Sequence, residues 1–239
     1  METFCLIHGA WHDDACWELL VAELTHRGHE CLTPVLPLED PGATFADYAA
    51  VVLDCLDGRE CAVLVGHSMA SAVIPLVAAR MGVKLLVYLC PAMSGFPSRR
   101  DEPPRLRAAW ARPPIDRDNR SWWPLERAIT QLYGRVEPQL AERLARRLRP
   151  QPQVVFSAPY PLERPPEVPS AFIYAREDEL FDDSWSRWIS RTLLGVDAIE
   201  LRGGHFPMLE QTAILAEVLE QVSGTHSSGT DGPIPRSPN

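Results

Sequence analysis

The pentapeptide Gly66-His67-Ser68-Met69-Ala70 follows an apolar run over residues 61–65 and precedes a helical pattern over residues 70–81. An apolar run bounded by turn residues predicts a buried strand, and apolar positions at helical spacing predict a helix. A serine on a sharp strand-to-helix turn has its hydroxyl raised above the edge of the sheet, and small neighbours let the backbone pass closely. Ser68 is therefore the candidate nucleophile. The pattern also fits a serine that only caps the helix N-terminus.

Strands and helices alternate on both sides of this turn. The predicted strands cover residues 4–8, 30–35, 61–65, 84–90, 170–174 and 198–201. The predicted helices cover residues 15–27, 48–56, 70–81 and 214–222, with a further helix through Trp185 and Ile189. Repeated strand–helix units, some with fully apolar strands, predict a mainly parallel sheet flanked by helices.

The segment over residues 93–166 interrupts the alternation. It is rich in proline and arginine, and it has amphipathic stretches over residues 125–133 and 138–148. We expect a helical cap of about these bounds, inserted into a single domain over residues 1–222 whose core is 1–92 and 167–222. Residues 223–239 are rich in Ser, Gly, Pro and Thr and are predicted to be a disordered tail.

A serine hydroxyl needs a base to remove its proton, because it is a weak nucleophile at neutral pH. The stretch Arg202-Gly203-Gly204-His205-Phe206-Pro207 follows a predicted strand and precedes the last helix, which places His205 at the same carboxyl edge of the sheet as Ser68. His26 and His29 flank a helix end near the opposite edge. His205 is thus the candidate base, and an ordinary surface histidine is the alternative.

The carboxylate that orients the base is expected on a loop after another strand at this edge. Asp178 stands four residues beyond the strand over residues 170–174. Glu177, Glu179 and Asp182 lie in the same loop, so position selects Asp178 more than residue type does. An acidic cluster at a helix N-terminus is the alternative interpretation.

Acyl transfer requires donors for the developing oxyanion, commonly two backbone N–H groups. The residue after the nucleophile, Met69, supplies one. The loop after the first strand, His8-Gly9-Ala10-Trp11, is expected to supply the other from Ala10. A plain turn at Gly9 would explain that loop equally.

Composition excludes several classes of function. The 239 residues carry a formal net charge of −9, so no excess of positive charge exists for nucleic acid or an anionic membrane surface. Lys84 is the only lysine, and no metal-ligand spacing or phosphate-binding loop is present. No signal sequence and no apolar run of about 20 residues is visible, which predicts a soluble, cytoplasmic protein. The cysteines are expected to be reduced; they are Cys5, Cys16, Cys31, Cys55, Cys61 and Cys90.

With nucleophile, acid and base in the chain order Ser, Asp, His, residues 1–222 resemble the small α/β-hydrolases related to plant methylesterases, salicylate-binding esterases and hydroxynitrile lyases. The resemblance rests on Leu6-Ile7-His8-Gly9-Ala10-Trp11-His12 with Trp17, the turn at Ser68, and the segments 148–152, 177–181 and 203–205. It implies the α/β-hydrolase fold, a Ser68–Asp178–His205 triad, and neither metal nor organic cofactor.

The resemblance also bears on the reaction. The hydroxynitrile lyases carry a threonine and a lysine where this chain has Gly9 and Phe206. Without that hydroxyl and that charge nothing steers a departing cyanide, which favours ester cleavage. The expected walls of a hydrophobic substrate pocket, which are equally suited to the core, are Trp11, Cys90, Met93, Trp122, Trp123, Tyr133 and Phe206.

The predicted function is hydrolysis of a small to medium hydrophobic ester, lactone or thioester through an acyl-enzyme on Ser68, by a monomer or homodimer. Two alternatives remain open. The same residues can serve a lyase, an acyltransferase or a cyclase, and a receptor-like relative can bind a small molecule without turnover.

Overall fold

A computed structural model describes residues 1–59, 62–96 and 98–225. Its centre is a parallel sheet with the strand order β2-β1-β3-β4-β7-β8. The strands are β1 (Thr3–Ile7), β2 (Glu30–Leu32), β3 (Val63–His67), β4 (Leu85–Leu89), β7 (Ser170–Ala175) and β8 (Ala198–Leu201). The prediction of a mainly parallel sheet flanked by helices is confirmed.

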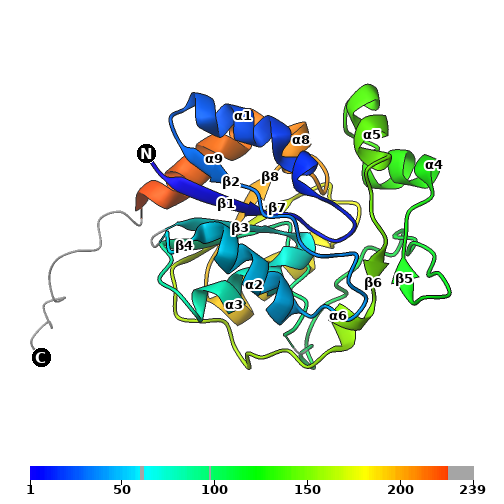
Figure 1. Cartoon of the computed structure of the whole chain (residues 1–239), viewed down its shortest axis with the longest axis horizontal. Helices are drawn as coiled ribbons and strands as arrows, with labels where there is room; N and C mark the ends of the chain where they lie inside the picture. Colours follow the sequence, from blue (N-terminus) through cyan, green and yellow to red (C-terminus); the bar gives the residue numbers. More distant parts are fainter. Residues whose placement is uncertain (60–61, 97, 226–239) are drawn as a thin grey trace, which may run out of the picture.

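The middle strands are apolar because both faces of the sheet are covered. Every residue of β3 and β4 is buried. In Figure 1, α1 (Glu18–His26), α8 (Pro207–Glu210) and α9 (Thr212–Thr225) lie on one side of the sheet, and α2 (Phe45–Leu56) and α3 (Ile74–Ala78) lie on the other. Burial of such apolar strands is the main source of stability of a fold of this kind.

Most predicted bounds differ from the structure by a few residues, and three of the differences are the most informative. β2 ends at Leu32, because it is an edge strand and Pro34 cannot donate to a ladder. The helix predicted over residues 70–81 is divided into a 3₁₀ turn η2 (Ser68–Ala72) and the short α3, since Pro75 occupies the start of α3. Helix α9 continues to Thr225, three residues into the segment predicted as a tail; residues 226–239 lie outside the described residues.

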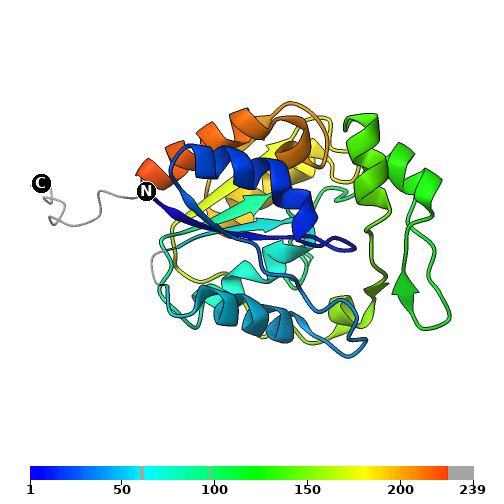
Figure 2. The same ribbon diagram turned by 45° about the horizontal axis from the view of Figure 1, so that its top comes forward.

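Between β4 and β7 the chain leaves the sheet and forms a group of short elements, here called the cap, which is seen at the right of Figure 1 and, in green, in Figure 2. The cap elements are β5 (Arg120–Ser121), α4 (Leu125–Arg127), the π-helix η3 (Ala128–Leu132), α5 (Pro138–Ala145), β6 (Gln151–Pro152) and α6 (Val154–Ser157). The cap lies beyond the carboxyl ends of the sheet strands.

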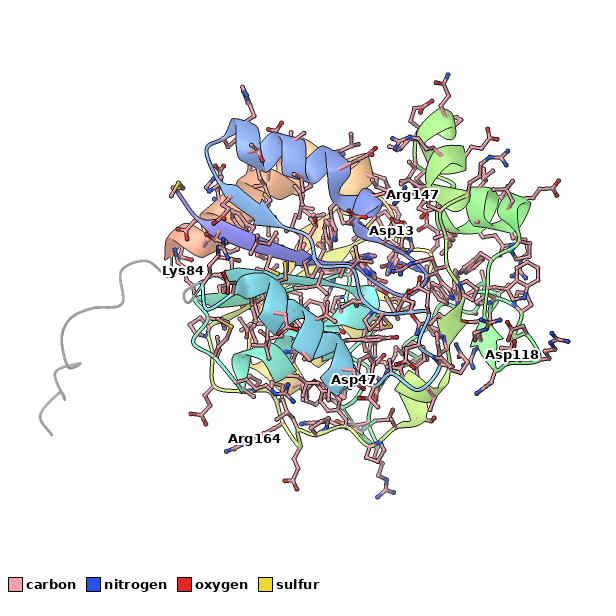
Figure 3. All side chains as sticks on the ribbon, in the orientation of Figure 1. Asp13, Asp47, Lys84, Asp118, Arg147 and Arg164 are labelled. Carbon is pink, nitrogen blue, oxygen red and sulfur yellow. The ribbon has the colours of Figure 1, made fainter. Side chains whose placement is uncertain are left out.

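Ion pairs join the cap to the first helical segment of the core. Arg147 contacts Asp13 at 2.7 Å, and Figure 3 labels these two residues close to each other. Arg143 pairs with Glu18 at the start of α1. Among the described residues, no helix is long and apolar enough to cross a membrane.

Candidate active site

Ser68 occupies a strained turn between β3 and η2. Its φ is +51°, a left-handed conformation that non-glycine residues rarely adopt outside functional sites. The neighbouring Gly66 is required, because a Cβ there would lie 2.7 Å from the carbonyl oxygen of Ala70. Gly9 also packs closely, since a Cβ on it would lie 3.1 Å from the Cβ of Ser68. The sequence therefore folds into the turn predicted for the candidate nucleophile.

Asp178 and His205 form a buried pair at the same edge of the sheet. His205 Nδ1 lies 2.8 Å from Asp178 Oδ2, and each side chain is 3% exposed. The other carboxylate oxygen, Oδ1, accepts from the backbone N–H groups of Leu180 at 2.7 Å and Phe181 at 3.0 Å. Asp178 is thus fixed on both oxygens and holds the imidazole by its Nδ1.

The competing carboxylates of this loop have other partners. Glu177 accepts from the N–H of Gly203, and Glu179 accepts from the N–H of His205. Asp182 caps helix α7 (Asp183–Ile189) by accepting from the Ser184 N–H. Among these carboxylates, Asp178 is the one hydrogen bonded to the His205 ring.

His67 joins the serine turn to the loop of His205. Its Nε2 donates to the backbone carbonyl of His205 at 2.9 Å, and the two rings have centroids 4.7 Å apart. Burial, followed by the nearby His205, lowers the pKa of His67 well below its usual value. A neutral His67 therefore holds the two loops together.

The candidate oxyanion loop is fixed by two histidines. His8 Nε2 accepts from the Leu36 N–H, so the ring proton is on Nδ1, which donates to the Gly9 carbonyl at 2.9 Å. The N–H of that same peptide belongs to Ala10, and it points away from the carbonyl because the peptide is trans and planar. His12 Nδ1 in turn donates to the carbonyl of Ala10 at 2.6 Å.

The two candidate oxyanion donors meet at one cavity. Ala10 and Met69 both line it, as does Ser68. Met69 is the second residue of η2, where N–H groups have no carbonyl partner within the helix. Both residues predicted to supply oxyanion donors therefore lie at the cavity that Ser68 lines.

The cavity has a volume of about 500 Å³ and is mainly apolar. Trp11 lines it, as predicted. Its other walls are Ala92, Ser94, Arg105, Leu106, Trp110, Arg112, Pro113, Ile115, Ser121, Gln153, Phe156, Leu180 and Phe181. The ring of Phe181 also lies 5.4 Å from that of His205, so the cavity wall reaches the candidate base.

The remaining predicted wall residues do not line this cavity. Cys90 and Met93 are buried, and the thiol of Cys90 lies near the polar atoms of Asp178 and His205. Trp122 and Trp123 line a different hollow beside the segment over residues 148–150.

Two further predicted wall residues, Tyr133 and Phe206, pack in the protein interior. The Tyr133 hydroxyl is 2.7 Å from His12 Nε2, and the rings of Tyr133 and Phe206 have centroids 5.0 Å apart. Tyr133 therefore supports the oxyanion loop through His12, because the hydroxyl donates to the free ring nitrogen.

No sequence pattern marked the true walls in the cap. Leu106, Trp110 and Ile115 stand in irregular segments whose places are set by tertiary contacts, such as the isolated bridge of Leu106 with Phe181. Phe181 had a usable signal, because it lies three residues after the candidate acid.

Among the described residues, Cys90, Asp178 and His205 are the one group close enough together to suggest metal ligation. Asp178 and His205 are already hydrogen bonded to each other. Burial, reinforced by the nearby carboxylate, raises the pKa of the Cys90 thiol well above its usual value. Since the thiolate is the form that binds metals, these residues are a poor metal site.

Acidification is expected to destabilise the fold through its buried histidines. Burial lowers the pKa of His12 to about 4 and that of His8 to about 3. The unfolded chain, with pKa values near 6.5, then binds more protons than the folded chain. Stability should therefore be full above pH 6.5 and fall as the pH drops toward 4, by roughly 1.4 kcal/mol per pH unit for each histidine.

Urea unfolding at pH 7, 6 and 5 measures this slope. The variant His12→Asn should have a shallower pH dependence than the wild type, whatever its stability at pH 7. The exposed His26 provides the matched control, so His26→Asn should keep the wild-type slope. If the unfolding free energy of His12→Asn depended on pH as steeply as that of the wild type, His12 would not be a source of the acid destabilisation.

Comparison with known proteins confirms the predicted α/β-hydrolase fold. A family model described as "Alpha/beta hydrolase family" matches residues 6–218. A carbendazim hydrolyzing esterase of Nocardioides sp. (strain SG-4G) is 37% identical over 37% of this chain and 41% of that protein. A pyrethroid hydrolase of Sphingobium wenxiniae is 26% identical over 90% of this chain and 85% of that protein. The methylesterase MES16 from Arabidopsis superposes with a TM-score of 0.77 at 18% identity, over 94% of this chain and 100% of that one.

Proposed function

The chain belongs to the alpha/beta hydrolase family, and we propose that it is a carboxylic ester hydrolase that acts through an acyl-enzyme on Ser68. The observation that carries the proposal is the buried hydrogen bond between Asp178 and His205, made at the same edge as the strained turn of Ser68. The relatives with curated names are an esterase and a hydrolase, which supports hydrolysis.

The first half of the reaction forms the acyl-enzyme. Ser68 Oγ attacks the carbonyl carbon of the ester while His205 Nε2 accepts the hydroxyl proton. Asp178 stabilises the imidazolium and keeps the Nδ1 proton in place. The N–H groups of Ala10 and Met69 donate to the oxyanion, which then collapses and expels the alcohol with the proton from His205.

The second half releases the acid. Water enters the site, His205 Nε2 accepts its proton, and the resulting hydroxide attacks the acyl carbon. Collapse of the second tetrahedral intermediate breaks the bond to Ser68 Oγ, which recovers its proton from His205. No redox step and no added group is needed in this sequence.

The cavity walls support a hydrophobic substrate. Trp11, Trp110, Phe156 and Phe181 surround the space beside Ser68, and a volume of about 500 Å³ suits a small to medium ester. Lactones and thioesters present the same electrophilic carbonyl. We therefore propose hydrophobic esters, including aromatic ones, as the substrate class.

Turnover of a graded series of p-nitrophenyl esters, from acetate to decanoate, tests the function. We expect steady hydrolysis, with kcat/KM rising with acyl length and then falling once the chain exceeds the cavity. Rapid mixing should reveal a burst of up to one equivalent of nitrophenol if deacylation is slower than acylation. Folded protein that cleaves none of these esters and is not labelled by a fluorophosphonate would contradict the proposal.

A further inference from the structure

Three glutamates hold three successive backbone N–H groups in the loop of the candidate base. Glu177 accepts from Gly203, Glu210 accepts from Gly204 at 2.7 Å, and Glu179 Oε2 accepts from His205 at 3.1 Å. Hydrogen bonds to ionised acceptors are stronger than neutral ones. The backbone of this loop is thus fixed by side chains.

Glu179 also contacts the cap. Its Oε1 accepts from Arg135 Nε at 2.9 Å, and Arg135 stands in the turn between η3 and α5. Glu179 and Arg135 pack closely against Gly204, where an added Cβ would lie 2.7 Å from the Glu179 oxygens and 2.9 Å from Arg135 Cδ. One carboxylate therefore joins a cap residue to the backbone of His205.

We propose that Arg135 and Glu179 are positioning residues through which the cap sets the place of His205. The proposal rests on the proposed function, because it assigns His205 the role of base. Neither side chain lines the cavity beside Ser68, so both act through the loop.

The contact between Arg135 and Glu179 is expected to affect the position of His205 more than the stability of the fold. The Arg135 side chain is 49% exposed and that of Glu179 is 29% exposed, and ion pairs of this kind contribute little to folding. A displacement of a catalytic group by about 1 Å, by contrast, can lower a rate by about a hundredfold. Loosening this loop should therefore reduce kcat more than it reduces the melting temperature.

The chain offers substitutions that separate the two contacts. Glu179→Ala removes both, whereas Glu179→Gln keeps an oxygen for the His205 N–H and loses the charge that attracts Arg135. Arg135→Gln removes the cap contact alone. Arg146→Gln is the matched control, because Arg146 follows α5 directly, pairs with Glu142 of that helix and has a side chain that is 61% exposed.

The kinetic test compares kcat and KM for one p-nitrophenyl ester. We expect Glu179→Ala to lower kcat about tenfold with little change in KM. Glu179→Gln and Arg135→Gln should each lower kcat only about threefold, and Arg146→Gln should match the wild type. Arg135→Gln should not lower kcat further in the Glu179→Ala background, because the contact between Arg135 and Glu179 is already absent there.

Hydrogen exchange of the peptide over residues 202–206 provides a readout independent of activity. Exchange should accelerate by at least about tenfold in Glu179→Ala, less in Arg135→Gln, and not in Arg146→Gln. The proposed positioning role would be wrong if residues 202–206 exchanged in Glu179→Ala at the wild-type rate. It would also be wrong if Arg135→Gln still lowered kcat in the Glu179→Ala background. If the wild type cleaves no ester, the proposed function fails. The exchange rates then still show whether Arg135 and Glu179 hold the loop of His205 in place.

Discussion

Ester turnover by the Ser68→Ala variant is expected to fall at least about a thousandfold in kcat relative to the wild type. The substitution removes the atom that attacks the carbonyl carbon, while the oxyanion donors of Ala10 and Met69 and the cavity remain. Substrate binding should therefore persist. Steady-state kinetics give the loss in kcat, and equilibrium dialysis with a slowly cleaved ester gives the retained affinity.

The left-handed backbone at residue 68 calls for a second variant. Alanine at a φ of +51° carries the same strain as serine, whereas glycine adopts this conformation freely. Ser68→Gly should thus be inactive and at least as stable as Ser68→Ala. Ser94 lines the same cavity, so Ser94→Ala serves as the matched control and should keep kcat within a few fold. Equal losses at residues 68 and 94 would argue against the assigned nucleophile.

The sheet was predictable because burial on both faces leaves a simple mark. Residues 63–65 of β3 and all of β4 form apolar runs, and each strand is followed by a turn or loop at the carboxyl edge. Parallel strands then bring their carboxyl ends together, so residues far apart in sequence, such as Ser68 and His205, were expected at one edge. The fold class follows from periodicity and chain order.

The cavity was not predictable for the opposite reason. Trp110 and Ile115 occupy irregular segments, where no period indicates which way a side chain points. Trp122 and Trp123 were attractive candidates because of their size, yet the two-stranded pairing of β5 and β6 directs this segment to another hollow. Large aromatic residues fill cores and pockets alike, so residue type alone cannot separate the two.

The acidic residue that contacts His205 was predictable only in part. The sequence placed four carboxylates in one loop, and their individual hydrogen bonds depend on backbone geometry that residue type does not encode. The structure separates them by partner: Asp178 contacts the imidazole, whereas Glu177 and Glu179 contact backbone N–H groups. That separation can be tested by substitution.

Asp178→Asn is expected to lower kcat by about ten thousandfold while the fold is retained. The amide oxygen still accepts from the N–H groups of Leu180 and Phe181, as Oδ1 does now. Its NH₂ then faces His205 Nδ1 and donates to it, which moves the ring proton to Nε2. A histidine protonated at Nε2 cannot accept the proton of Ser68, so acylation fails although the side chains keep their places.

The matched control is Glu177→Gln, in the same loop and one residue away. Its amide oxygen can still accept from the Gly203 N–H, so kcat should fall by no more than a few fold. Steady-state kinetics of both variants on the same ester give the two losses in kcat. A loss in Glu177→Gln as large as that in Asp178→Asn would mean that the loop as a whole, rather than the Asp178 carboxylate, decides which ring nitrogen of His205 carries the proton.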